Sequence, residues 1–205
     1  MKEVSRREFL KNAAATGAAL AASAALLRPA AAETGVIRPP GALEKDEFLS
    51  RCIRCGRCGD ACPSQAIMMF TEANGEKFSL KPGPGDDGTP IIFPRQKACN
   101  LCQKVDGEYL RCTEACPTGA LTKLLKSEVT TKVKMGVARL DKNLCYSYND
   151  RCCGVCLRAC PFPGKALKSS MHEMPVVDPA LCVGCGLCER SCIRYPQAIV
   201  VVADV

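Results

Sequence analysis

The spacing of the cysteines constrains this chain more than any other feature. Of its 17 cysteines, all but one fall into four groups of four, at residues 52–62, 99–116, 145–160 and 182–192. A spacing that recurs in this way is an internal repeat, and it predicts that one structural unit occurs several times along the chain. The grouped cysteines are Cys52, Cys55, Cys58, Cys62, Cys99, Cys102, Cys112, Cys116, Cys145, Cys153, Cys156, Cys160, Cys182, Cys185, Cys188 and Cys192.

The spacing within the groups points to iron–sulfur chemistry. The first and fourth groups read C-x2-C-x2-C-x3-C, which is the bacterial ferredoxin pattern, whereas the second and third groups are stretched by longer gaps. Two-residue gaps let a short loop turn three sulfurs toward one cubane cluster. The fourth cysteine begins a new element, and in two-cluster ferredoxins it binds the other cluster. The pattern therefore predicts that the sixteen grouped cysteines are iron ligands and that the chain binds four [4Fe–4S] clusters.

Cysteines also serve in disulfides and in zinc sites. Disulfides stabilise small cysteine-rich domains, but they do not require this repeated spacing. Zinc sites use pairs of C-x2-C, which the second and third groups alone would satisfy; the first and fourth groups place too many thiolates too closely for one zinc ion. Cys152 is left over, because only Cys153 has the right spacing to Cys156 and Cys160, and we interpret it as a spare thiol.

The spacing leaves open which groups share clusters. Pairing the first group with the second, and the third with the fourth, would give two tandem modules. The nested alternative pairs the first with the fourth and the second with the third, so that regular groups join regular ones and stretched groups join stretched ones. We favour the nested pairing. The expected fold class is α+β and ferredoxin-like, with two bacterial-type 2[4Fe–4S] modules that carry insertions.

The first 32 residues have the features of an export signal. Arg6 and Arg7 lie in the motif at residues 5–11, an Ala-rich apolar run follows, and three alanines at 30–32 suit a cleavage site. The apolar run is shorter than the roughly 20 residues needed to span a bilayer. We therefore expect a twin-arginine signal peptide over residues 1–32, which would deliver the folded protein with its cofactors to the periplasm.

The segments outside the cysteine groups give weaker predictions. Residues 33–44 are rich in Pro and Gly and are expected to be a linker, so that 45–205 forms the four-cluster region. Residues 45–51 predict a short helix, and each group is followed by a short turn that leads into an apolar strand. The run 81–90 predicts a surface loop. Five cationic side chains in 122–140 are interpreted as a solvated face, with a docking patch for an acidic redox partner as the alternative.

Neither a catalytic centre nor a nucleic-acid site can be assembled from the sequence. The one histidine, His172, has no Ser-His-Asp or Cys-His constellation around it. No G-x-G-x-x-G motif follows a predicted strand, so no flavin or nicotinamide site is expected. The formal net charge of +7 does not indicate nucleic acid, because no basic stripe is interleaved with aromatic residues. The chain is therefore expected to be an electron carrier rather than an enzyme.

The export signal, the four groups and the sequence RCCGVCLRACP at residues 151–161 together resemble the MauM/NapG family of ferredoxin-type proteins. The resemblance covers nearly the whole chain and implies that the sixteen cysteines are the family's ligands. It implies a periplasmic protein that relays quinol-derived electrons toward a periplasmic nitrate reductase. It also implies two partners, a membrane-bound, quinol-oxidising iron–sulfur protein (NapH-like) and a periplasmic redox acceptor. The chain would be peripheral to the membrane through the first partner. The departures are the extra Cys152 and Ile193, which stands where a proline is usual.

Other functions stay open at this point. The chain would also suit an electron-transfer subunit of another twin-arginine-exported oxidoreductase, such as an NrfC-like subunit, a dimethyl-sulfoxide-reductase-type subunit or a protein of methylamine oxidation. A maturation factor for such an enzyme, or a binding protein stabilised by zinc or disulfides, would use the same cysteines without passing electrons.

Overall fold

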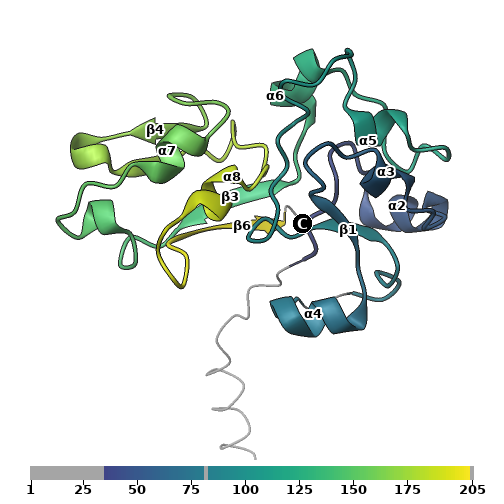
Figure 1. Ribbon diagram of the computed structural model, residues 1–205, viewed down its shortest axis with the longest axis horizontal. Coiled ribbons are helices and arrows are strands. Elements are labelled where there is room, and N and C mark those ends of the chain that lie inside the picture. Colours follow the sequence, from purple (N-terminus) through teal and green to yellow (C-terminus); the bar gives the residue numbers. More distant parts are fainter. Residues whose placement is uncertain (1–34, 81–82, 204–205) are drawn as a thin grey trace, which may run out of the picture. The chain divides into compact units, whose positions relative to one another are not determined.

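The computed structural model describes residues 35–80 and 83–203 (Figure 1). The predicted signal peptide at 1–32 lies outside the described residues. Short helices and three two-stranded antiparallel sheets make up the described part, in agreement with the expected mixture of helix and strand. Over these residues, no helix has the length and apolar character that crossing a membrane requires.

Four of the short helices carry the third cysteine of a group at their second position. A glycine in the left-handed conformation stands directly before three of them, at Gly56, Gly154 and Gly186, with φ of 76°, 56° and 81°. Such an angle is nearly free of strain only for glycine. The repeat of the sequence is thus also a repeat of structure. These helices are α3 (Arg57–Asp60), α5 (Arg111–Glu114), α7 (Val155–Ala159) and α8 (Leu187–Ser191).

Strands follow three of the four groups, as predicted. After the second group no strand forms, and Leu121 makes a single β-bridge to Ala42 instead. The paired strands are β1 (Ile67–Met69) with β2 (Pro90–Ile92), β4 (Leu167–Ser169) with β5 (Pro175–Val177), and β3 (Gly136–Leu140) with β6 (Ile199–Ala203). In the first two pairs, one strand follows a group and its partner precedes the next group.

The predicted helix over residues 45–51 is present as α2 (Lys45–Arg51), which buries Phe48 completely. A further helix, α4 (Glu72–Phe78), was not predicted. Its N-cap is Thr71, which forms a capping box with Asn74, because each side chain accepts a hydrogen bond from the other's backbone N–H. The remaining helices are η1 (Lys126–Glu128), α6 (Val129–Lys132), η2 (Tyr146–Tyr148) and η3 (Met171–Glu173).

Residues 35–44, expected to be part of a linker, pack into the fold. Ile37 is buried and bridges to Ile92. The Leu43 N–H donates to the Ala120 carbonyl at 3.2 Å, and the Thr122 N–H donates to the Gly41 carbonyl at 2.7 Å. This segment therefore pairs with the chain that follows the second group, just as β3 pairs with the chain that follows the fourth.

Neighbouring cysteine groups lie together. In the first half of the described chain, residues 35–125, α3 packs against α5; in the second half, residues 133–203, α7 packs against α8 (Figure 1). The favoured nested pairing is therefore wrong, and the tandem alternative is the one that the structure has. Similar spacing shows which groups have the same local geometry, but it does not show which of them are neighbours in space.

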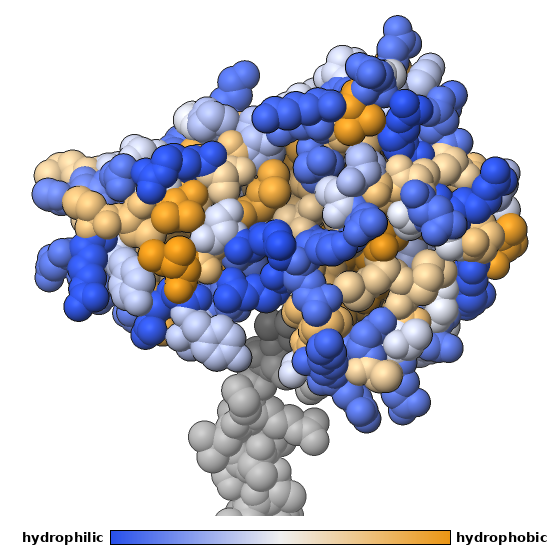
Figure 2. Space-filling view, in the orientation of Figure 1, coloured by the Kyte–Doolittle hydropathy of each residue, from blue (hydrophilic) through white to orange (hydrophobic). Residues whose placement is uncertain are grey.

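Cysteines replace large side chains in much of the core. The largest fully buried side chains include Phe48, Phe70, Ile91 and Leu110, all in the first half. The core cluster also contains many of the grouped cysteines, which compensates for an aromatic content of 5%. Figure 2 shows hydrophilic side chains over much of one face, with hydrophobic ones between them.

Candidate iron–sulfur sites

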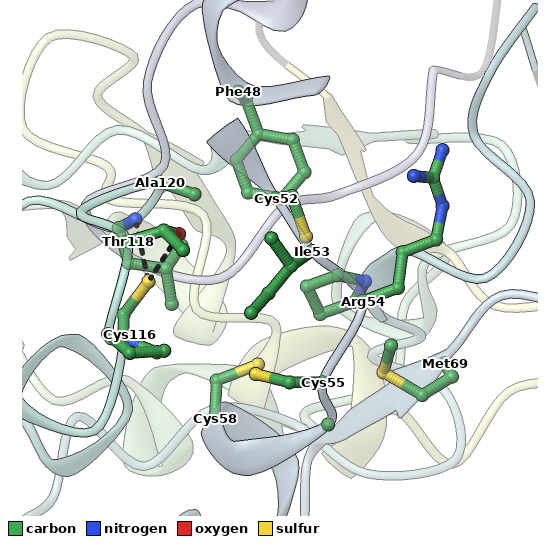
Figure 3. A pocket seen from close by; sticks show the side chains of 14 residues that line it. Phe48, Cys52, Ile53, Arg54, Cys55, Cys58, Met69, Cys116, Thr118 and Ala120 are labelled. Atoms are coloured by element: carbon green, nitrogen blue, oxygen red, sulfur yellow. Dashed lines mark hydrogen bonds between the residues drawn. The ribbon is translucent and has the colours of Figure 1, made fainter. Parts of the chain in front are cut away.

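Four cysteines from the first two groups line one pocket, which we call site A. They are Cys52, Cys55 and Cys58 of the first group and Cys116 of the second. The pocket contains about 340 Å³ of empty space, part of it open to solvent. Figure 3 shows the sulfurs of Cys55 and Cys58 close together, with Cys116 on another side of the same space. Apolar side chains, among them Phe48, complete the wall.

Site D is the counterpart of site A in the second half. Cys182, Cys185 and Cys188 of the fourth group and Cys160 of the third line a pocket with about 370 Å³ of empty space. As in site A, three cysteines come from the regular group and the fourth comes from the stretched group. The other lining residues are mostly apolar and include Phe162, Leu167, Val183 and Val201.

The other eight cysteines form two more sets, each made of three cysteines of a stretched group and the fourth cysteine of its regular neighbour. Burial raises the pKa of Cys112, and the thiols of Cys99, Cys102, Cys62 and, least, Cys58 of site A raise it further. Burial also raises the pKa of Cys156 to about 11, helped by Cys145, Cys153 and Cys192. We call the first set site B (Cys62, Cys99, Cys102, Cys112) and the second set site C (Cys145, Cys153, Cys156, Cys192).

The short helices explain why each group contributes to two sites. Helix α3 carries Cys58 of site A and ends before Cys62, which belongs to site B. Helix α5 carries Cys112 of site B and ends before Cys116, which belongs to site A. Because α3 and α5 lie against each other, each fourth cysteine reaches the site of the neighbouring group. Helices α7 and α8 repeat this exchange between sites C and D.

Burial shapes the acid–base behaviour of these thiols. It raises the pKa of Cys58 to about 11 and those of Cys99 and Cys185 to about 12. Such thiols are protonated at neutral pH. Since iron binds the thiolate, loading these sites must release protons.

The pKa of Cys116 is lowered, in contrast to the raised pKa values of Cys58, Cys99 and Cys185. Burial acts to raise the pKa, but hydrogen bonds from Leu121, Thr118 and Ala120 outweigh it. The Leu121 N–H lies 3.4 Å from the sulfur and the Thr118 hydroxyl 3.8 Å from it. Figure 3 draws Thr118 turned toward Cys116. These hydrogen bonds favour the thiolate form of this sulfur at the edge of site A.

The donor sets fit [4Fe–4S] clusters. Each site offers four sulfurs, the two pockets have largely apolar walls, and backbone N–H groups point at several sulfurs. The N–H groups of Ala66, Leu101, Arg111 and Ala138 lie 3.4–3.5 Å from the sulfurs of Cys62, Cys99, Cys102 and Cys182. Hydrogen bonds to sulfur and burial are the two means by which proteins adjust cluster potentials. Among the described side chains, no three or more His, Cys, Asp or Glu residues are arranged to hold a single metal ion.

Cys152 and His172 belong to none of the four sites, and both are exposed. In the basic segment 122–140, most cationic side chains have partners within the chain. Lys123 and Lys132 pair with Glu114 and Glu128, while Lys126 and Lys134 donate to backbone carbonyls. These contacts favour the interpretation of the segment as a solvated face.

Sequence reasoning missed a buried ion pair beside site A. The Arg38 guanidinium contacts Asp86 at 2.5 Å and lies 4.6 Å from the centre of the Phe48 ring, which lines the site. Burial lowers the pKa of Arg38, while Asp86 and Cys52 oppose that shift. Arg38 and Asp86 are far apart in sequence, so no local motif indicates that they pair.

Comparison with known proteins agrees with the predicted chemistry. A family model described as a 4Fe-4S dicluster domain matches residues 51–120, which span the first two groups, and a 4Fe-4S binding domain matches residues 174–199. The first match is what the tandem pairing requires.

Several relatives are similar over most of their length. The methylamine utilization ferredoxin-type protein MauM of Methylobacillus flagellatus is 38% identical over 180 residues, which cover 84% of this chain and 70% of MauM. MauM of Paracoccus denitrificans is 35% identical over 211 residues, covering 97% and 87%. The ferredoxin-type protein NapG of Escherichia coli is 32% identical over 209 residues, covering 95% and 84%. The predicted resemblance is thus confirmed, and the chain belongs to the family of MauM and NapG ferredoxin-type proteins, which makes it a 4Fe–4S electron-transfer protein.

Proposed function

We propose that this chain is a periplasmic electron carrier that binds four [4Fe–4S] clusters through its sixteen grouped cysteines. One observation carries the proposal: both halves bring three cysteines of one group together with the fourth cysteine of the neighbouring group, in both directions. A bound cluster supplies one-electron storage and transfer without the making or breaking of bonds in a substrate.

The residues of the chain hold and insulate the sites. All four cysteines of site B are buried, whereas Cys55 of site A is exposed. Ile53 beside it is 63% exposed, so site A has an edge that a redox partner can approach. Such an arrangement suits a carrier, which must shield its cofactors from water and still exchange electrons at its surface.

In the cell, the electrons would come from quinol and pass toward a periplasmic nitrate reductase. The donor would be a membrane-bound, quinol-oxidising iron–sulfur protein of the NapH kind, and the acceptor a periplasmic redox protein. The chain would be peripheral to the membrane through the donor, and residues 1–32 would direct its export by the twin-arginine route. Support comes from the NapG relatives, at 32–33% identity over 95% of this chain.

A role in methylamine utilization is the second candidate. Four MauM relatives are 34–38% identical to this chain, slightly more than the NapG relatives. Complementation separates the two candidates. Expression in strains that lack either relative should restore nitrate-dependent growth in the first case and growth on methylamine in the second.

Iron analysis and low-temperature EPR test the four-cluster carrier directly. Anaerobically purified protein should contain about sixteen irons per chain, and dithionite should produce interacting signals of reduced [4Fe–4S] clusters. About eight irons would reject the four-cluster proposal, and zinc in place of iron would reject electron transfer altogether. A maturation factor is distinguished by a folded variant that lacks site A, because it would still support the partner enzyme.

A further inference from the structure

The two halves meet where two cysteine-bearing segments touch, residues 94–99 of the first half and residues 184–192 of the second. The Cys99 N–H donates to the Cys185 carbonyl at 2.9 Å. Nearby, Arg95 Nη1 donates to the Cys192 carbonyl at 3.1 Å, and Arg190 Nη1 donates to the Arg95 carbonyl at 3.3 Å. The contact, which we call the junction, thus joins backbone that directly carries cluster ligands.

Two further features make the junction close and specific. Gln197, with its amide oxygen turned toward Arg95, accepts from the guanidinium at 2.7–2.9 Å. Gly186 lies against Pro94 so tightly that a Cβ on the glycine would stand 2.4 Å from the proline Cβ. Only a residue without a side chain fits there at the observed φ of 81°.

The junction joins the first half to site D of the second half more directly than to site C. Cys99 belongs to site B and Cys185 to site D. The backbones of these two residues are hydrogen-bonded to each other, whereas Cys192 of site C is reached only through the Arg95 side chain. Within the halves, α3 packs against α5 and α7 packs against α8, so site A is the neighbour of site B and site C is the neighbour of site D.

We infer that the four sites are ordered A–B–D–C and that electrons cross between the halves at the contact of Cys99 with Cys185. The inference rests on the proposed function. In the crossing, one of the two inner sites is oxidised by one electron and the other is reduced by one; no proton or bond changes hands, and quinol-derived electrons supply the reductant. Sites A and C are the outer sites, through which the chain exchanges electrons with its partners.

Ligand variants can isolate the inner sites. Cys55→Ala with Cys153→Ala removes one ligand from each outer site and leaves sites B and D complete. After dithionite reduction, this double variant should keep EPR signals split by spin–spin interaction between two clusters. The matched double variant, Cys99→Ala with Cys185→Ala, keeps sites A and C complete and should show two signals without that splitting. Unsplit signals in the first variant, or split signals in the second, would overturn the order.

A pair of glycine variants tests the junction without removing any ligand. Gly56 and Gly186 occupy equivalent positions, with φ of 76° and 81°, but a Cβ at Gly56 meets nothing within 4 Å. Alanine at either position brings the same backbone strain beside a site, and only Gly186→Ala also presses on Pro94. Spin–spin interaction between clusters of the two halves should broaden the EPR signals of the reduced protein. This broadening should be lost in Gly186→Ala and kept in Gly56→Ala. Equal spectra from both variants would overturn the inference.

The iron content separates this inference from the proposed function. Wild-type protein with far fewer than about sixteen irons would reject the four-cluster carrier itself. Protein with the full iron content whose inner sites do not interact would reject only the order of the sites and the crossing at the junction.

Discussion

The two halves of the molecule share one arrangement of cysteines and short helices, but they differ in which side chains they bury. In the first half, five of the eight site cysteines are buried, against three of eight in the second. The first half also buries two aromatic side chains completely, Phe48 and Phe70, whereas the largest side chains that the second half buries completely are the aliphatic Ile199 and Val133. The same cysteine framework therefore supports a conventional hydrophobic core in one half, while the other half relies more on its clusters for cohesion.

A parallel position makes the comparison sharper. The residue after the third cysteine is Thr113 in the second group and Glu189 in the fourth, and both are buried. Thr113 Oγ1 accepts from the Leu124 N–H at 3.2 Å, and Glu189 Oε2 accepts from the Val201 N–H at 2.7 Å. Through this hydrogen bond, each side chain holds the backbone of the segment that follows its cysteine group. One half does so with a neutral hydroxyl and the other with a carboxyl group.

The largest effect is expected from removing a buried ligand. Cys112→Ala takes one of four sulfurs from site B, which lies inside the hydrophobic core, so the chain should lose at least one cluster, or about four irons. The equivalent change in the second half, Cys156→Ala, should cost as much iron but more secondary structure, because that half buries fewer large side chains and relies more on its clusters for cohesion. Iron analysis and circular dichroism of anaerobic protein measure both losses.

Cys152→Ala serves as the control for these two variants. Its thiol is exposed and lies in none of the four sites, so iron content should remain that of the wild type. Loss of a cluster in this variant would show that the assignment of the sixteen ligands is wrong. Equal loss of secondary structure in Cys112→Ala and Cys156→Ala would contradict the difference drawn between the halves.

A smaller but still substantial effect should follow from breaking the buried ion pair of the first half. Asp86→Asn leaves the Arg38 guanidinium unpaired in a buried setting, which should lower the free energy of unfolding by about 3 kcal/mol. In the second half, Glu173→Gln removes the partner of Arg158, whose side chain is 64% exposed, and should cost less than about 1 kcal/mol. Anaerobic denaturation in guanidinium chloride compares the two. Similar losses would mean that Arg38 is better hydrated than its burial indicates.

Local features of this molecule were predictable, and long-range ones were not. The cysteine spacing gave the grouping of sulfurs, because three sulfurs in one short loop reach one cluster, and residues 45–51 form the expected helix. The N-cap of α4 could also have been predicted from the sequence, since Thr71 and Asn74 are three residues apart. The pairing of groups was predicted wrongly, because identical spacing does not identify neighbours. The contact of Cys99 with Cys185 joins two distant segments, so no periodicity within either segment encodes it.

The smallest effect concerns Glu189, a buried carboxyl group that accepts a hydrogen bond from a strand in the second half. Burial raises the pKa of Glu189 above its ordinary value of 4.5, although the Val201 N–H and Arg95 oppose the shift. A raised carboxyl pKa means that the folded protein holds its proton to higher pH than the unfolded chain does. The contribution of Glu189 to stability is therefore complete below about pH 4.5 and is lost as the pH rises through the folded-state pKa.

Glu189→Gln keeps an oxygen that can accept a hydrogen bond from the Val201 N–H but carries no titrating group. The variant should therefore lose the decline in stability that Glu189 causes as the pH rises. Thermal unfolding midpoints of the anaerobic, loaded protein, measured from pH 5 to about pH 8, should fall less steeply for the variant than for the wild type. Thr113→Ser in the first half keeps the hydroxyl acceptor and adds no charge, so its pH slope should match the wild type. If Glu189→Gln kept the wild-type slope, the carboxyl group would be titrating as it does in water. The two halves would then fasten their strands with side chains that behave alike.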